Sequence, residues 1–265
     1  MPLPASLDLA GRVALVTGAG SPTGIGFATA RQLGSLGGAV VLGATSERVH
    51  DPVAELASDG IAALGVPGDL TDPEAAEALV GAVVDWRGRL DVLVNNAGMV
   101  STAAPDFHAG DLLGTSPERW SLSMRRNLDT AFLVTRAALP HLRAAGQGRV
   151  VMVASVTGAV MGMRAEVAYA AAKAGLVGLT RSLAVDEGRY GLTVNAVAPG
   201  WIATGSQTEH EAAEGHVTPP GRSGTADEVA AAIAFLASPG AGYVNGQVLV
   251  IDGGNSVVEE RALRR

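Results

Sequence analysis

The stretch VALVTGAGSPTGIG, residues 13–26, joins a β-branched apolar run to a helical pattern that continues to residue 36. Four glycines, at positions 18, 20, 24 and 26, fall between the two patterns. Glycines in such a turn allow a sharp change of direction and let backbone N–H groups approach a pyrophosphate at the helix N-terminus. The stretch therefore predicts a strand, a glycine-rich turn and a helix that together bind a dinucleotide.

The same alternation of short apolar runs and longer Ala-rich segments continues along the chain. The further runs lie at residues 39–42, 62–66, 90–94, 149–153, 193–197 and 247–251. Continuous apolar runs are typical of strands that are buried on both faces. Strand–helix alternation predicts the α/β class, with a doubly wound parallel sheet of about seven strands and helices on both faces. We expect one domain over residues 1–265.

Composition excludes several classes of function. The net charge of −7 argues against a nucleic-acid-binding surface, because neutralising phosphates requires clustered basic residues. The chain has no cysteine, which excludes disulfides and thiolate metal sites, and its five histidines are dispersed, so we expect no metal site. No signal peptide or membrane-spanning apolar run is visible, so we expect a cytoplasmic protein that does not bind membranes.

A tyrosine and the only lysine of the chain are four positions apart, at Tyr169 and Lys173. On a helix, residues i and i+4 lie on the same face. An ammonium group beside a phenol favours the ionised phenol and lowers its pKa from the ordinary value of about 10. Lysine is a compact charge, whereas arginine presents a wide planar fork. The pair therefore predicts a side chain that donates a proton during catalysis.

These motifs occur in a familiar order. The glycine-rich turn, the sequence NNAG at 95–98, the Tyr169/Lys173 pair and the Pro199-Gly200 turn resemble the short-chain dehydrogenase/reductase family in order and spacing, over roughly residues 9–255. Residues 44–47 and 195–202 resemble the β-ketoacyl-acyl-carrier-protein reductase branch of that family. The resemblance implies a Rossmann fold and an oxidoreductase that uses a nicotinamide dinucleotide.

The resemblance also implies a catalytic set. Tyr169 would act as general acid in carbonyl reduction, or as base in alcohol oxidation. Lys173 would lower the pKa of Tyr169 and hold the hydroxyls of the nicotinamide ribose. Ser155 would form a hydrogen bond with the substrate oxygen. Asn127 would complete a water-mediated proton relay to Lys173.

The cofactor contacts follow from the same resemblance. Asp69 and Leu70 would lie at the adenine, Asn96 would shape the cleft, and Ile202 and Thr204 would lie at the nicotinamide. The full set of expected cofactor-binding residues comprises Gly18, Ser21, Gly24, Ile25, Gly26, Thr45, Asp69, Leu70, Asn96, Tyr169, Lys173, Ile202 and Thr204.

The choice between NADP and NAD depends on the end of the second strand. NAD-binding folds place a carboxylate there, whereas this chain has the neutral hydroxyls of Thr45 and Ser46, which favours NADP(H), with Arg48 assisting. Glu47 is the counter-argument: turned inward, it would repel a 2′-phosphate and restore a preference for NAD(H).

Several features depart from the family pattern. Five residues separate Gly18 from Gly24, two more than is common, and Thr23 stands where many NADP-dependent relatives carry a basic residue. Ser155 and Tyr169 are fourteen positions apart, one more than usual, so residues 161–164 must bulge and could displace Ser155. Residues 99–117 and 205–220 lack periodicity, and we expect both to be irregular walls of the substrate site.

The favoured function is an NADP(H)-dependent oxidoreductase that interconverts a small-molecule carbonyl and a secondary alcohol, with a 3-oxoacyl thioester or related ketone as candidate substrate. The alternatives are an NAD-dependent alcohol, sugar or steroid dehydrogenase and a non-catalytic dinucleotide-binding sensor. Enoyl reduction is disfavoured because relatives with that chemistry usually space the tyrosine and lysine further apart. Gly175 and Gly178, on the helix that carries the pair, permit close helix contact. Because members of the family associate through this helix, the resemblance implies a homodimer or homotetramer.

Overall fold

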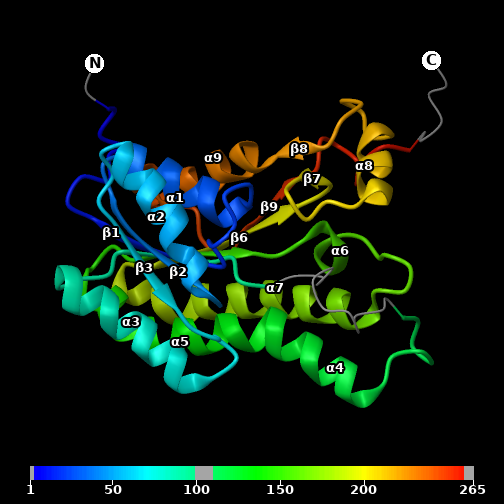
Figure 1. The fold of residues 1–265 in the computed structure, drawn as a ribbon, viewed down its shortest axis with the longest axis horizontal. Helices are drawn as coiled ribbons and strands as arrows, with labels where there is room; N and C mark the ends of the chain where they lie inside the picture. The colour runs from blue at the N-terminus through cyan, green and yellow to red at the C-terminus, as the bar shows by residue number, and fades with distance from the viewer. Residues whose placement is uncertain (1–2, 99–109, 260–265) are drawn as a thin grey trace.

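The structure is a computed structural model that describes residues 3–98 and 110–259. Its main sheet has seven strands that are all parallel (Figure 1). Their order is β3-β2-β1-β4-β5-β6-β9, so the prediction of a parallel sheet of about seven strands is confirmed. Each strand lies within two residues of its expected ends. The strands are β1 Val13–Thr17, β2 Ala39–Ala44, β3 Ala63–Pro67, β4 Val92–Asn95, β5 Arg149–Val153, β6 Thr193–Pro199 and β9 Val248–Ile251.

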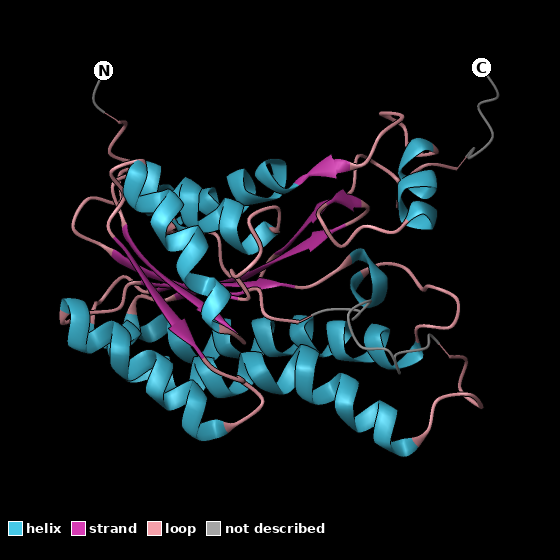
Figure 2. Cartoon of the chain, in the orientation of Figure 1, coloured by secondary structure: helices cyan, strands magenta, loops and turns pink. Residues whose placement is uncertain are grey.

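Helices cover both faces of this sheet (Figures 1 and 2). One face carries α1 Ile25–Ser35, α2 His50–Ser58 and α9 Ala226–Ala237, and the other carries α3 Pro73–Arg87, α5 Thr130–Ala144 and α7 Val167–Glu187. Successive strand residues enter opposite cores: Leu15 packs with the α3, α5 and α7 side, and Val16 packs with the α1 and α9 side. This alternation is the two-residue period of a strand with both faces buried.

The remaining elements are short. They comprise α4 Pro117–Met124, a π-helical segment Arg125–Asp129, α6 Val156–Ala159, α8 Glu209–His216, the pair β7 Ile202–Ala203 and β8 Gly224–Thr225, and the 3₁₀ turns Glu47–Val49, Gly188–Tyr190 and Pro239–Ala241. Local sequence accounts for two helix starts, because Thr208 and Thr225 form capping boxes with Glu211 and Glu228.

The strand register gathers all the carboxyl ends along one side of the sheet, here called the carboxyl edge. Thr17 lies level with Gly43, and Val153 lies level with Val197. β1 pairs with both β2 and β4, so the direction of chain winding reverses between β1 and β4. Parallel α/β sheets bind ligands at the carboxyl edge beside such a reversal. The glycine-rich turn follows β1 at this point.

The two segments expected to be irregular have different outcomes. Residues 205–220 contain the eight-residue helix α8, so the expectation of an irregular wall is wrong there. The Thr208/Glu211 capping box explains the helix, and its polar, unperiodic sequence concealed it. Most of the other segment, residues 99–109, lies outside the described residues.

Two searches over residues 3–98 and 110–259 gave negative results. No helix there is long and apolar enough to cross a membrane. No group of three or more potential metal-ligating side chains occurs within the same residues.

Candidate active site

The glycine-rich turn passes so close to its neighbours that side chains would not fit. Gly18 has φ +66°, and a Cβ placed on it would lie 2.8 Å from the Cα of Ala97. A Cβ on Gly26 would lie 2.9 Å from the Cα of Ala19. Gly24 is the N-cap of α1 and gives the helix no side-chain hydrogen bond, which leaves the first N–H groups open to a ligand. This cradle fits the pyrophosphate of a dinucleotide.

Asn96 holds the cradle by joining the ends of β1 and β4. Its Nδ2 donates to the carbonyl oxygens of Thr17 and Gly18, at 3.0 and 2.9 Å. The Thr17 hydroxyl oxygen in turn accepts from the backbone N–H groups of Asn96 and Ala97, at 3.0 and 2.9 Å. Sequence reasoning missed Thr17, although a threonine that ends the first strand was a usable signal.

The expected adenosine-side residues all follow strands at the carboxyl edge. Thr45 comes just after β2 and is exposed, whereas Leu70, after β3, is buried. Asp69 turns the chain locally, because its Oδ1 accepts from the N–H and hydroxyl of Thr71. Ser21 is exposed in the glycine-rich turn.

Glu47 follows the end of β2 closely. Its Oε2 lies 3.0 Å from Nε2 of His50, and both side chains are largely exposed to solvent. The Glu47 carboxylate is therefore engaged by a neighbouring side chain.

The nicotinamide-side segment contacts the glycine-rich turn directly. Ile202 begins β7, and the hydroxyl of Thr204 lies 3.1 Å from that of Ser206. The N–H of Gly205 donates to Oγ1 of Thr23 at 3.0 Å. Thr23 belongs to the unusually long turn, so its extra length joins the two sides of the cleft.

Lys173 is buried in the middle of the site, with 3 % of its surface exposed. Its Nζ donates to the carbonyl oxygen of Val153 at 2.9 Å and lies 5.7 Å from the centre of the Tyr169 ring. Among the described residues Lys173 forms no ion pair. Burial without a counter-charge lowers the pKa of Lys173 to about 8.

The Ser155 hydroxyl acts on the Tyr169 phenol and lowers its pKa, but burial outweighs this effect and raises the pKa to about 12. The charges of Glu166 and Glu211 raise it further. The expected lowering of the Tyr169 pKa is therefore wrong for this structure. The physical reason is desolvation, since water is removed from the phenol while the Lys173 ammonium is bound to the carbonyl of Val153.

Two unusual backbone conformations accommodate the one-residue increase in spacing between Ser155 and Tyr169. Ala165 has φ +59° and is the only non-glycine residue with positive φ in the described part of the chain. Gly158, at φ +94°, lets the loop lie directly against α7, since a Cβ there would be 2.9 Å from the backbone nitrogen of Ala174. Together these two conformations keep Ser155 beside Tyr169.

Asn127 lies in the π-helical segment between α4 and α5 and is buried. Its Nδ2 donates to the carbonyl of Ser123 at 3.2 Å. A Cβ on Gly98 would lie 2.9 Å from Oδ1 of Asn127 and 3.4 Å from Nζ of Lys173. Gly98 therefore separates the two side chains, and only glycine leaves room for both. Single π turns in helices are frequent at functional sites.

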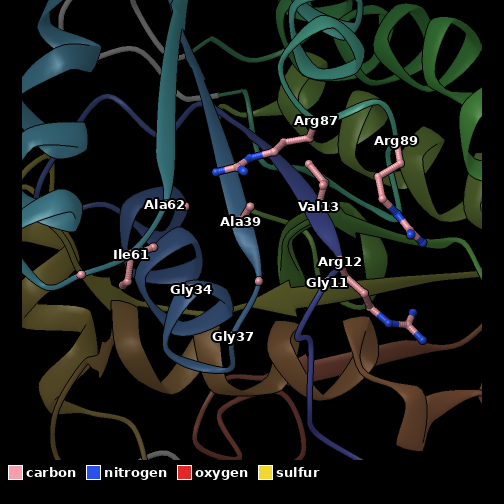
Figure 3. Close-up of a pocket in the computed structure, with 12 residues that line it drawn as sticks. Gly11, Arg12, Val13, Gly34, Gly37, Ala39, Ile61, Ala62, Arg87 and Arg89 are labelled. Carbon is pink, nitrogen blue, oxygen red and sulfur yellow. The ribbon is translucent and has the colours of Figure 1, made fainter.

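A second hollow lies at the opposite, amino edge of the sheet (Figure 3). It measures about 410 Å³ and is lined by glycines and by Arg12, Arg87 and Arg89. Arg12 is bound to Gln147 and Arg89 to Asp91. Arg87 extends toward one side of the hollow and the other two arginines toward the other side. The hollow shares no residue with the site at the carboxyl edge.

Comparisons with known proteins agree with this geometry. A family model described as enoyl-(acyl carrier protein) reductase matches residues 18–256. The chain is 39% identical to 3-oxoacyl-[acyl-carrier-protein] reductase of Vibrio cholerae, over 94% of this chain and 98% of that protein. The chain belongs to the short-chain dehydrogenase/reductase family. It is an oxidoreductase that acts on CH–OH groups with NAD(P), as members of this family are.

Two further members are similar over almost the whole chain. Cis-4-hydroxycyclohexanecarboxylate dehydrogenase of Sinomonas cyclohexanicum is 43% identical over 93% of this short-chain dehydrogenase/reductase and 97% of the relative. The crystal structure of a dehydrogenase/reductase from Sinorhizobium meliloti superposes with a TM-score of 0.87, at 33% identity, over 96% of this chain and 98% of that one.

Proposed function

We propose that this protein is an NADP(H)-dependent oxidoreductase that interconverts a ketone and a secondary alcohol. The observation that carries the proposal is the convergence of Ser155, Tyr169 and Lys173 beside the glycine cradle at the carboxyl edge. A bound nicotinamide would supply or accept the hydride at the substrate carbon. The protein supplies the proton, the orientation and the exclusion of water.

Tyr169 would exchange the proton. In reduction its hydroxyl donates to the carbonyl oxygen as the carbon receives hydride, and in oxidation it takes the proton back. Ser155, which acts on the Tyr169 phenol, would hold the same substrate oxygen. The pKa of about 12 keeps Tyr169 protonated at neutral pH, which is the form needed for reduction.

Lys173 and Asn127 would support the proton transfer. Lys173 would hold the nicotinamide ribose with the ammonium that Val153 orients. Asn127, across Gly98 from Lys173, would pass protons to it through water.

The preference for NADP(H) is supported at the end of β2. Glu47 is engaged by His50, so its carboxylate already has a partner other than a ribose hydroxyl. Arg48 is exposed and forms no ion pair within the described residues, so its guanidinium is available for a phosphate. If NAD(H) instead proves the better cofactor, the hydroxyls of Thr45 and Ser46 would form hydrogen bonds with the ribose 2′-hydroxyl and not with a 2′-phosphate.

The substrate is the finer part of the proposal. The Vibrio cholerae relative is named for a 3-oxoacyl thioester and the Sinomonas relative for a ring alcohol. A matrix of NADPH and NADH against acyl thioesters, ketones, sugars and steroids tests both possibilities. Oxidation of NADPH by at least one carbonyl class is expected. Cofactor binding without turnover of any class would overturn the proposal and favour the dinucleotide-binding sensor.

The mechanism is tested by Tyr169→Phe. Loss of general acid catalysis is expected to lower kcat by about 10²- to 10⁴-fold, while NADPH binding, followed by fluorescence, changes little. Tyr243→Phe is the matched control, because Tyr243 is fully exposed and should leave kcat unchanged. Substantial activity in Tyr169→Phe would assign the acid to another residue.

Assembly as a homodimer or homotetramer through α7 remains part of the proposal. Gly175 is occupied within the chain, since a Cβ there would lie 2.8 Å from Cδ2 of Leu128. Gly178 has no atom within 4 Å of such a Cβ, so it presents a flat surface to a second copy. Light scattering is expected to give a dimer or tetramer at micromolar concentration, and a monomer would contradict the expectation.

A further inference from the structure

Glu166 is a largely buried residue whose carboxyl oxygens have no partner in the described part of the chain but are still reached by solvent. It precedes α7 as its N-cap residue, and 6 % of its surface is exposed. In the described part of the chain, no hydrogen bond or ion pair reaches its carboxyl oxygens, and it makes no side-chain cap. Glu187, at the other end of the same helix and equally buried, is held by two bonds of 2.7 Å from Arg143. The capping and ion-pair explanations that suit other glutamates therefore do not apply to Glu166.

Glu166 begins the helix that carries Tyr169. Glu166 comes three residues before Tyr169, and this spacing places two residues on the same side of a helix. The charge of Glu166 acts on the phenol, whose pKa it raises, and Glu211 of α8 acts on the same phenol. Glu211 is already fixed, because its Oε2 accepts from the N–H and hydroxyl of Thr208 at 2.7 and 3.0 Å. Glu166 is thus the carboxyl near Tyr169 that still lacks a donor.

A carboxylate in a largely buried residue is partly desolvated, which disfavours its charged form. The pKa of Glu166 is raised, first by burial and then by the like charge of Glu211. A ligand that brings a hydrogen-bond donor to this position would satisfy the carboxylate. A ligand that brings a second anion would be repelled by both glutamates.

We propose that Glu166 determines substrate specificity by accepting a hydrogen bond from a hydroxyl or ammonium group near the reacting carbon, with Glu211 adding negative charge. The substrate class is then an alcohol or ketone that carries a second hydrogen-bond donor, such as a diol, a hydroxyketone or an amino alcohol. This inference rests on the proposed function, because it assumes that Tyr169 works on the neighbouring oxygen. A site built to bind a substrate donor strongly disfavours the analogue that lacks it.

Four ring alcohols of similar size test the proposal: cyclohexanol, cyclohexane-1,2-diol, 2-aminocyclohexanol and 2-hydroxycyclohexanecarboxylate, each oxidised with NADP⁺. In the native protein, kcat/KM is expected to be at least about tenfold higher for the diol or the amino alcohol than for cyclohexanol, and lowest for the carboxylate. Glu166→Ala should remove this preference by lowering kcat/KM for the donor-bearing probes about tenfold or more, while cyclohexanol changes less than about twofold.

The variant Glu166→Gln distinguishes a substrate hydroxyl from a substrate ammonium group as the donor, because it keeps a hydrogen-bond acceptor and removes the charge. A hydroxyl-specific site should retain most of its activity with the diol in this variant, whereas an ammonium-specific site should lose its activity with the amino alcohol. In both cases the carboxylate probe should improve. Glu77→Gln, on the exposed surface of α3, is the matched control and should change none of the four values.

An equal loss with all four probes in Glu166→Ala would overturn the inference and leave the proposed function intact, since Glu166 would then be structural. Equal activity of the native protein with cyclohexanol and the diol would overturn it as well. The assays of NADPH and NADH against different carbonyl classes could instead identify a substrate unlike these ring alcohols. The inference then requires that this substrate carries a second hydrogen-bond donor, and a substrate without a second donor would refute it. Absence of turnover with every compound would instead contradict the proposed function.

Discussion

Buried charged side chains have several hydrogen-bond partners at the amino edge of the sheet but few at the carboxyl edge. At the amino edge, Asp91 accepts from the N–H of Val13 at 2.9 Å and from Arg89 at 2.8 and 2.6 Å. The buried Arg149 donates there to three backbone carbonyls. At the carboxyl edge, Lys173 has one carbonyl and Glu166 has none. Natural proteins break local rules mainly where function requires it, so the unsatisfied edge is where ligands are expected.

This contrast also bears on the hollow at the amino edge. Arginines line the hollow at the amino edge, but two of the three are bound within the chain and their guanidinium groups do not converge (Figure 3). The carboxyl edge has fewer charges, but its glycine-rich turn, Lys173 and Glu166 all lie in segments that follow the carboxyl ends of strands. Unsatisfied groups that converge are better evidence for a ligand than a larger number of charges.

The largest effect is expected at the carboxyl edge from Lys173→Arg. The site leaves a narrow space between Val153 and Gly98, and a planar guanidinium fork is too wide for it. We expect kcat/KM to fall about 10²- to 10³-fold, or about 3–4 kcal/mol in transition-state stabilisation, in steady-state assays. Lys173→Met, which keeps the length and removes the charge, should be at least as inactive. Near-native activity of the Lys173→Arg enzyme would refute the argument from shape.

The wild-type protein offers a direct control, because it contains a single lysine. A protein labelled with ¹⁵N at the lysine side chain should give one Nζ resonance, and this should titrate near pH 8 instead of near 10.5. Because burial disfavours the ammonium, the charged form should decline as pH rises through 8. For carbonyl reduction, kcat/KM with respect to the cofactor should fall over the same interval. Titration near 10.5 would show that Lys173 is not desolvated.

A smaller effect, on stability alone, is expected at the amino edge from Asp91→Ala. The substitution leaves the buried N–H of Val13 without an acceptor, whereas Arg89 is half exposed and can turn to water. We expect the free energy of unfolding to fall by about 2 kcal/mol, measured by urea denaturation. Asp91→Asn, which keeps one acceptor, should lose less. The kcat of the folded Asp91→Ala protein should be unchanged; a loss of kcat would contradict the division between the edges.

The sequence was sufficient to predict the parallel sheet, because each strand is a short, continuous apolar run. Such runs are typical of strands that are buried on both faces by helices. The sequence was also sufficient to place Ser155, Tyr169 and Lys173 together, although their roles remain proposals. The helix α8 was missed because its capping box, and not apolar periodicity, defines it. A periodic pattern reports packing against the core, and α8 has little core to pack against.

The rest of the site depends on distances that no linear pattern contains. Gly98 is an ordinary glycine in the sequence, and only the fold shows that Asn127 and Lys173 lie on either side of it. The shift in the Tyr169 pKa was predicted in the wrong direction. The four-residue spacing indicated that a lysine lies beside the phenol, but it could not indicate that the phenol is buried away from water. Glu166 gave no signal, since a glutamate next to a helix start is usually solvated or capping.

The smallest effect is expected from Glu166→Gln, which tests whether the unsatisfied carboxyl reduces stability. We expect the variant to be more stable than the native protein by about 1 kcal/mol at pH 8, measured by urea denaturation. The raised pKa of Glu166 determines the direction of the stability difference. Below the ordinary value of 4.5, Glu166 is protonated in both the folded and the unfolded protein, so the native protein and the variant should be equally stable. As pH rises from 4.5 through the higher pKa of the folded state, the unfolded carboxyl ionises first, so native stability falls relative to the variant. Glu77→Gln should show no such pH-dependent difference. A Glu166→Gln protein that is less stable at pH 8 would mean that a partner satisfies this carboxyl in solution, and the contrast between the two edges would fail at that residue.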